Sequence, residues 1–197
     1  MSPALLAAFL AAAIPSFFTP GPNNLMLMAS TARFGLARTI PMAVGICLGF
    51  PLMVLVIGLG LSEVFVQYPW LKSVLKYVAV ANFLWMAWQL LGLRIGEAQG
   101  GDRPLGLFQA MLFQWVNPKA WAMAVSLVAL VVDPGESRVL TLVFVTLGCL
   151  ALSPFSSLLW MVFGRQLDRV LKRAGLERFL GAILAALMIV AVVLFLL

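Results

Sequence analysis

Six long apolar segments run through this sequence, and they limit the folds that the chain can adopt. A helix needs about 20 residues to cross the ~30 Å hydrocarbon core of a bilayer, and each segment approaches or exceeds that length. Hydrophobic residues make up 63% of the 197 and charged residues only 10%, so a compact soluble domain of this size could not bury the apolar surface. The predicted spans cover residues 3–32, 39–61, 70–93, 105–132, 139–163 and 179–197.

These segments favour helices over a membrane barrel. Barrel strands alternate apolar and polar residues over about 10 positions, whereas the segments are apolar on every side. The loops between them are short and leave no room for a soluble domain, so we expect an all-α membrane protein in which residues 1–197 form a single transmembrane transport domain. No basic residue precedes the first apolar stretch, which predicts a retained first span rather than a cleaved signal peptide.

The basic residues gather in alternate loops, and this pattern predicts the orientation of the chain. The formal net charge is +6, and such an excess in a membrane protein reports orientation rather than nucleic-acid binding. The first, third and fifth loops carry most of the cations: Arg33, Arg38, Arg94, Arg103, Arg165, Arg169, Lys172, Arg173 and Arg178. We expect these loops in the cytoplasm and both termini outside. The fifth loop, residues 165–178, is either a topology anchor or a basic helix on anionic headgroups.

The first span is too long for one straight helix and contains its own break. Residues 3–32 would measure roughly 45 Å as a continuous helix, and prolines and a glycine within them favour departure from helical angles. A half-helix that restarts at Pro22 would aim its amides and its positive dipole end into the gap, which favours a carboxylate. A simple proline kink is the alternative. The residues that we expect to contact a ligand here are Pro20, Gly21, Pro22, Asn23 and Asn24.

The fourth span has a milder break around Asn117 and Pro118, with Gln114 on the same helical side. Lys119 follows directly, and a lysine in the middle of a span costs about 2.5–3.5 kcal/mol on insertion scales. No carboxylate lies at matching depth in the sequence, since the nearest candidate, Glu63, falls near the outer end of the second span. A buried lysine without a protein anion predicts a site for a substrate anion, and we expect the ligand to be contacted here by Gln114, Asn117, Pro118 and Lys119.

An internal repeat supports a transport site between two halves, residues 3–93 and 105–197. An odd number of spans in each half forces the halves into opposite orientations, and inverted repeats with interrupted spans are typical of secondary transporters. The second span of each half carries a glycine, five residues and then a proline. Gly45 and Gly49 also form a G-x-x-x-G pair that favours close helix packing. The candidate helix-break or hinge positions are Pro15, Gly45, Gly49, Pro51 and Pro154.

At these motifs the sequence resembles the LysE/RhtB family of bacterial amino-acid exporters. The motifs are Pro-Gly-Pro-Asn at residues 20–23, Asn-Pro-Lys-Ala at residues 117–120, and the basic turn at residues 33–38. The resemblance covers essentially the whole chain. It implies a multi-pass protein of the bacterial inner membrane that exports an amino acid or a derivative and is driven by the proton gradient, with protons as the coupling ion.

Rival functions remain open at the level of sequence. The chain has no histidine and two cysteines, Cys47 and Cys149, so we expect no metal site, no cofactor and no enzymatic activity. The two cysteines fall at nearly equivalent places in the halves, and a membrane thiol–disulfide electron carrier is the alternative function. A structural subunit or plain channel would leave Lys119 unexplained. The sequence does not decide whether the protein acts as a homo-oligomer.

Overall fold

The structure is a computed structural model of the whole chain. It describes residues 3–61, 103–132 and 138–196, together with isolated positions between residues 67 and 91. Every element in these ranges is helical, as expected for an all-α protein. Most of the predicted third span, residues 70–93, lies outside the described residues.

The first predicted span is two helices, α1 (Pro3–Phe18) and α2 (Pro22–Phe34), bent by 42° at the break between them. The amide of Thr19 makes the last helical hydrogen bond, 2.9 Å to the carbonyl of Pro15. Pro20 and Pro22 carry no amide hydrogen, so the bonding pattern of α1 cannot continue through them. The predicted interruption of the first span is confirmed.

The second span is α3 (Leu36–Val56), followed by a π-helical turn, η1 (Ile57–Leu61). Gly35 separates α2 from α3 with a φ of 83°, a left-handed angle that favours glycine. The G-x-x-x-G packing prediction holds for α3 and α6 (Leu107–Phe113). A Cβ added to Gly45 would meet the carbonyl oxygen of Leu107, and one added to Gly49 would meet the Met111 backbone at 2.7 Å.

The fourth span is also broken, as predicted. A single 3₁₀ turn, η2 (Gln114–Val116), follows α6, and α7 (Pro118–Val131) begins after Asn117. Pro118 has no amide hydrogen, and a residue before proline is driven toward extended angles. Asn117 accordingly has φ −90° and ψ 109°, which ends one helix and starts the next.

The predicted fifth span, residues 139–163, is part of one longer helix. The helix α8 (Arg138–Ala174) continues through the basic segment that the sequence assigned to a loop. Lys172 pairs with Asp168 one turn earlier at 2.9 Å, and such pairs support an exposed helix. The helix ends where Gly175 takes a φ of 65°. A short turn, η3 (Glu177–Phe179), then leads into α9 (Leu180–Leu196).

Three of the candidate break positions, Pro15, Pro51 and Pro154, lie inside continuous helices: α1, α3 and α8. None of them ends its helix, because one proline removes a single amide and neighbouring helices can stabilise the turn around it. The breaks instead occur where a proline is joined by a second proline or by an N-capping asparagine. The hinge role of these residues, and of Gly45 and Gly49, stays a prediction.

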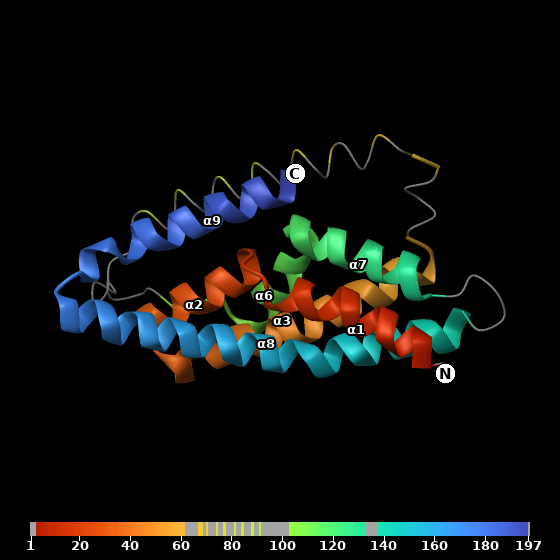
Figure 1. Cartoon of the computed structure of the whole chain (residues 1–197), viewed down its shortest axis with the longest axis horizontal. Helices are drawn as coiled ribbons and strands as arrows, with labels where there is room; N and C mark the ends of the chain where they lie inside the picture. Colours follow the sequence, from red (N-terminus) through yellow and green to blue (C-terminus); the bar gives the residue numbers. More distant parts are fainter. Residues whose placement is uncertain are drawn as a thin grey trace.

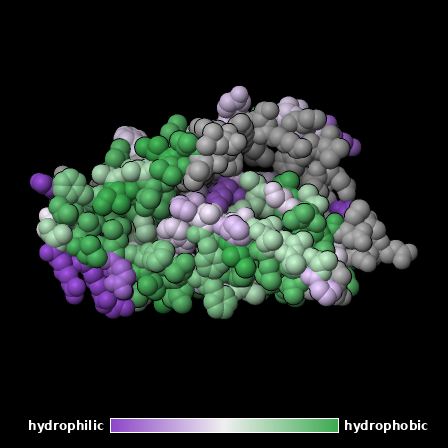
Figure 2. Space-filling view, in the orientation of Figure 1, coloured by the Kyte–Doolittle hydropathy of each residue, from purple (hydrophilic) through white to green (hydrophobic). Residues whose placement is uncertain are grey.

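Figure 1 shows α8 running along almost the whole length of the molecule, with α1, α2 and α3 lying along it. Two helices of the described residues, Leu36–Gly60 and Arg138–Ala174, are long and apolar enough to cross a membrane, and the bent pair α1 and α2 makes a third if it is counted as one span. The face drawn in Figure 2 is mostly hydrophobic where its residues are described, with a hydrophilic patch over the junction of α1, α2 and α7. This surface suits contact with lipid rather than water.

Candidate functional site

The two broken spans meet through three side-chain amides at their breaks. Asn23, in the first turn of α2, donates from Nδ2 to Oε1 of Gln114 over 2.8 Å. Asn117 donates from Nδ2 to Oδ1 of Asn23 over 3.0 Å. We call Asn23, Gln114 and Asn117 the amide cluster. It ties together residues more than 90 positions apart, and it confirms that the sequence motifs of the two halves meet in space.

Gln114 holds Asn23 in place within the amide cluster. Its side chain is fully buried, and its Nε2 donates to the carbonyl of Ala110 over 2.9 Å and to Asn23 Oδ1 over 3.3 Å. All of its polar atoms are therefore engaged with the protein. Sequence reasoning placed Gln114 against the ligand, but the structure places it behind Asn23, which it orients.

Asn117 caps the start of α7 with its own side chain. Its Oδ1 accepts from the backbone amides of Lys119 and Ala120, at 3.1 and 3.4 Å. This is the usual role of an N-cap asparagine. Because the cap uses the first free amides of α7, that helix start offers fewer donors to a ligand than an uncapped start would.

The start of α2 differs, because no side chain caps it. The N-cap position is Gly21, with an extended backbone, and Pro22 has no amide to donate. Among the described residues, no side chain accepts from the first amides of α2. Four amides at a helix start lack partners within the helix, so this end keeps both donors and positive dipole available for an anion.

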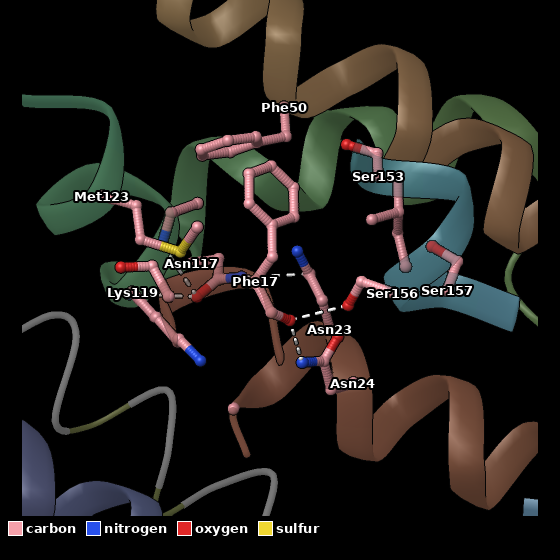
Figure 3. Close-up of a pocket in the computed structure, with 14 residues that line it drawn as sticks. Phe17, Asn23, Asn24, Phe50, Asn117, Lys119, Met123, Ser153, Ser156 and Ser157 are labelled. Carbon is pink, nitrogen blue, oxygen red and sulfur yellow. Dashed lines mark hydrogen bonds between the residues drawn. The ribbon is translucent and has the colours of Figure 1, made fainter. Parts of the chain in front are cut away.

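The carbonyls at the end of α1 are held by side chains of two other helices. Asn24 donates to the carbonyls of Phe17 and Thr19, at 2.9 and 2.8 Å. Ser156, from the middle of α8, donates to the same Phe17 carbonyl over 2.6 Å. Figure 3 shows this group, with Asn24 and Ser156 converging on the break. The backbone carbonyls that the break leaves without helical partners thus accept hydrogen bonds from polar side chains, as a non-aqueous environment requires.

Lys119 places a charge at the same junction. Its Nζ donates to the carbonyl and hydroxyl of Thr19, both at 2.8 Å, and to the carbonyl of Pro20 at 3.2 Å. Within the described residues it forms no ion pair with a carboxylate. Gly21 makes room for this side chain, since an added Cβ there would lie 2.5 Å from Cδ and 3.1 Å from Nζ of Lys119. In the part of the chain that the structure describes, the ammonium therefore meets neutral oxygens and no carboxylate.

A small cavity of about 40 Å³ lies between these groups. A buried water needs roughly 10–15 Å³ of such space, so the cavity has room for about three waters in this conformation. Of the predicted ligand contacts, the lining includes Gly21, Asn23, Asn24, Asn117 and Lys119. Pro20 contributes its carbonyl to Lys119, whereas Pro22 and Pro118 are buried beside the breaks and start their helices.

Three serines of α8 form a polar wall of this cavity that sequence reasoning missed. Ser153, Ser156 and Ser157 line it together with Ser16 of α1 and the rings of Phe17 and Phe50. Figure 3 shows the serines on the side opposite Lys119 and Asn117. The sequence does hold a signal, since three serines within five residues of an apolar span are typical of a helix face that packs against other helices and hydrogen-bonds across them. We call Ser153, Ser156 and Ser157 the serine wall.

The two cysteines are both free thiols. Cys47 of α3 lies 3.5 Å from the hydroxyl of Ser157, measured from Sγ. Cys149 of α8 is fully buried in an apolar cluster with Phe9 and Val145. Their surroundings differ, although the sequence places them at similar points of the two halves.

Known proteins are similar to this chain over nearly its whole length. Between residues 14 and 197 it matches the family model of the LysE type translocator. It is 28% identical over 192 residues to the cysteine/O-acetylserine efflux protein of Klebsiella pneumoniae, covering 96% of this chain and 95% of that protein. Proteins of the same name from Salmonella typhimurium and Escherichia coli O157:H7 are 26% and 27% identical over 190 residues, covering 96% of each chain. No solved structure matches significantly. Since the family model matches nearly the whole chain, this membrane protein belongs to the LysE type translocator family.

Proposed function

We propose that this chain is a secondary transporter that exports an amino acid or an amino-acid derivative from the cytoplasm. The observation that carries the proposal is the position of Lys119, whose ammonium lies at the junction of two interrupted helices and, among the described residues, is bonded to neutral oxygens alone. Membership of a translocator family supports transport. The names of the similar proteins, cysteine/O-acetylserine efflux proteins, support a small polar amino acid as the substrate.

The carboxylate of the substrate would bind between Lys119 and the uncapped start of α2. An anion there gains a charge-assisted bond to the ammonium and the dipole of the half-helix together. Gly21 keeps the backbone open for close approach, because it carries no side chain. When the carboxylate binds, Lys119 would give up some of its hydrogen bonds to Thr19. When the carboxylate leaves, these bonds would form again, which suits a site that binds and releases a substrate in turn.

The remaining polar atoms of the substrate would face the amide cluster and the serine wall. Asn23 and Asn117 line the cavity while Gln114 fixes their orientation. The serine wall lies on the opposite side of the cavity, where it would meet the side chain of the substrate. Hydroxyl groups donate and accept, so they suit a thiol, hydroxyl or ester oxygen better than a large apolar side chain.

The cavity must widen for transport, because about 40 Å³ does not hold an amino acid. We propose that residues 1–197 form one transport domain of six spans, arranged as inverted repeats over residues 3–93 and 105–197. Movement of one half against the other would then expose the site to each side in turn. Pro15, Gly45, Gly49, Pro51 and Pro154 are the proposed hinge positions.

We place the protein in the bacterial inner membrane, with both termini on the outer side and the basic loops in the cytoplasm. Export by proton antiport needs a group that carries the proton. The candidates are Lys119, the substrate itself and Glu63, which lies outside the described residues. A homo-oligomer is compatible with this arrangement.

The alternative function, a thiol–disulfide electron carrier, has less support. A cysteine that exchanges electrons must be reached by a partner thiol, and Cys149 is fully buried among apolar side chains. The double variant Cys47→Ser, Cys149→Ser separates the two functions. Transport should survive it, whereas an electron carrier would be inactive.

The experiment that tests the proposal measures export directly. Purified protein is reconstituted in vesicles loaded with radiolabelled cysteine, O-acetylserine, lysine or leucine, and efflux is followed with and without a proton gradient. We expect efflux of at least one small polar amino acid, which Lys119→Ala and Asn23→Ala abolish. Cells fed dipeptides give the matching test in vivo, since deletion of the gene should raise the internal level of the exported amino acid. Absence of any amino-acid efflux from competent vesicles would refute the proposal.

A further inference from the structure

A second, larger cavity lies away from the break, between the α2–α3 turn and the C-terminal part of α8. Its volume is about 560 Å³. In contrast to the first cavity, its lining is strongly charged. The polar residues around it are Thr31, Arg33, Arg165, Asp168, Arg169 and Lys172.

The described lining of this cavity carries a net positive charge. It includes four cations and one carboxylate, and that carboxylate, Asp168, is paired with Lys172 at 2.9 Å. Arg165 and Arg169 are one helical turn apart on α8, so they present their guanidinium groups on the same side. Both are exposed, and the planar fork of arginine suits bidentate binding of phosphate oxygens.

Thr31 gives a second, independent indication of a ligand. The residue lines the cavity although it is only 3% exposed. Its hydroxyl has no hydrogen-bond partner in the part of the chain that the structure describes. A buried hydroxyl without a partner is costly, and an oxygen atom of a ligand beside Thr31 would supply the missing bond.

The cavity lies where the apolar part of α8 ends. The helix is hydrophobic up to Phe163 and basic from Arg165 onward, and Figure 2 shows the change as a hydrophilic patch at this end of the molecule. At 1.5 Å per residue, the segment 139–163 alone measures roughly 37 Å, enough to cross the hydrocarbon core. The basic cavity therefore sits at the level of the lipid headgroups, where basic pockets between helices bind anionic lipids.

We propose that this cavity binds the phosphate group of an anionic phospholipid, held by Arg165 and Arg169 with Thr31 as a further donor. The bound headgroup would join the α2–α3 turn to α8 on the basic face. This site is separate from the amide cluster, and the proposal does not depend on the transported substrate.

The test measures lipid binding to the full-length protein in a neutral detergent. Phosphatidylglycerol is titrated into the wild type and two double variants, with phosphatidylcholine as the uncharged control lipid. The first variant, Arg165→Gln with Arg169→Gln, removes two cations from the cavity. The second, Arg173→Gln with Arg178→Gln, removes the same charge from neighbouring residues that do not line it. Native mass spectrometry counts the bound lipids.

We expect the first variant to weaken phosphatidylglycerol binding about tenfold, which corresponds to ~1.4 kcal/mol, and the second to leave it within about twofold. Thr31→Val, which keeps the shape and removes the hydroxyl, should weaken it as well. Glycerol 3-phosphate that binds this site more tightly than phosphatidylglycerol would overturn the assignment to a lipid in favour of a soluble phosphate ester. Equal loss in both double variants, or no preference for phosphatidylglycerol over phosphatidylcholine, would overturn the proposal.

Discussion

Asn23 and Asn117 are 94 positions apart in the sequence and are joined by a single hydrogen bond of 3.0 Å. The direction of that bond is fixed from both ends. The Ala110 carbonyl orients the Gln114 amide, which orients Asn23. At the other end, the Oδ1 of Asn117 is committed to the first amides of α7. One consistent set of donors and acceptors therefore runs from α6 through α2 to α7.

Asn117→Asp separates the two tasks of this residue. The aspartate still caps α7, because its oxygens accept from the same amides, but it cannot donate to Asn23. Asn117→Ala loses both tasks. We expect Asn117→Asp to unfold near the temperature of the wild type, while export falls at least tenfold. Asn117→Ala should lose a further ~1 kcal/mol of stability, as measured by tryptophan fluorescence during thermal unfolding in detergent. Wild-type export by the aspartate variant would show that the bond to Asn23 is dispensable.

Gly21→Ala tests the fit of Lys119 in the site. The backbone of Gly21 is extended, with a φ of −179°, so alanine causes no backbone strain. Its Cβ would lie 2.5 Å from Cδ of Lys119, which forces the lysine to move. We expect a rise of at least tenfold in the KM for export.

The matched control is Gly106→Ala, another N-cap glycine with an extended backbone. A Cβ there meets only Oε1 of Gln109, at an ordinary 3.7 Å. Its kinetics should be those of the wild type. If both alanine variants behave alike, the contact between residue 21 and the lysine is unimportant.

Gly164→Ala tests the packing that holds α8 against α2. The added Cβ would meet the backbone carbonyl of Met28, and backbone cannot move aside as a side chain can. Overpacking of this kind typically costs 1–3 kcal/mol, so we expect unfolding at a lower temperature. Val162→Ala, on the exposed side of the same helix, is the control and should have a smaller effect. A Gly164→Ala protein as stable as the wild type would contradict the close approach.

Ser157→Ala and Ser153→Ala test the serine wall as the side-chain part of the site. If these hydroxyls contact the substrate, the KM should rise for cysteine or O-acetylserine and stay unchanged for an amino acid with an apolar side chain. A merely structural role would affect every substrate alike. Competition experiments in vesicles, with both variants at matched protein levels, distinguish these outcomes.

The sequence predicted the breaks well because their cause is local. Pro20, Pro22 and Pro118 lack amide hydrogens wherever they stand, so both interruptions were visible without coordinates. The lysine beside Asn117 was equally visible, since a charge is rare in an apolar span. These local features also carried the family resemblance.

Other features depend on which helix faces meet, and sequence reasoning missed or misplaced them. Gln114 is buried behind Asn23 because α6 packs closely against Gly45 and Gly49. Ser156 reaches the Phe17 carbonyl from 139 positions away, and spacing along one helix cannot predict such a contact. The helix α8 continues to Ala174. A fall in hydropathy along the sequence indicates where the chain leaves the membrane, and it does not by itself end a helix.

The most direct test of the central claim is binding of a carboxylate at Lys119. Calorimetry measures the dissociation constants of three ligands: O-acetylserine, cysteine and the methyl ester of cysteine, which lacks the carboxylate. The proteins compared are the wild type, Lys119→Met and the control Leu112→Ala, in which an exposed side chain is shortened. We predict that the free amino acids bind the wild type and the control at least tenfold more tightly than the ester, and that Lys119→Met loses this preference. Equal preference in Lys119→Met and the wild type would contradict the account.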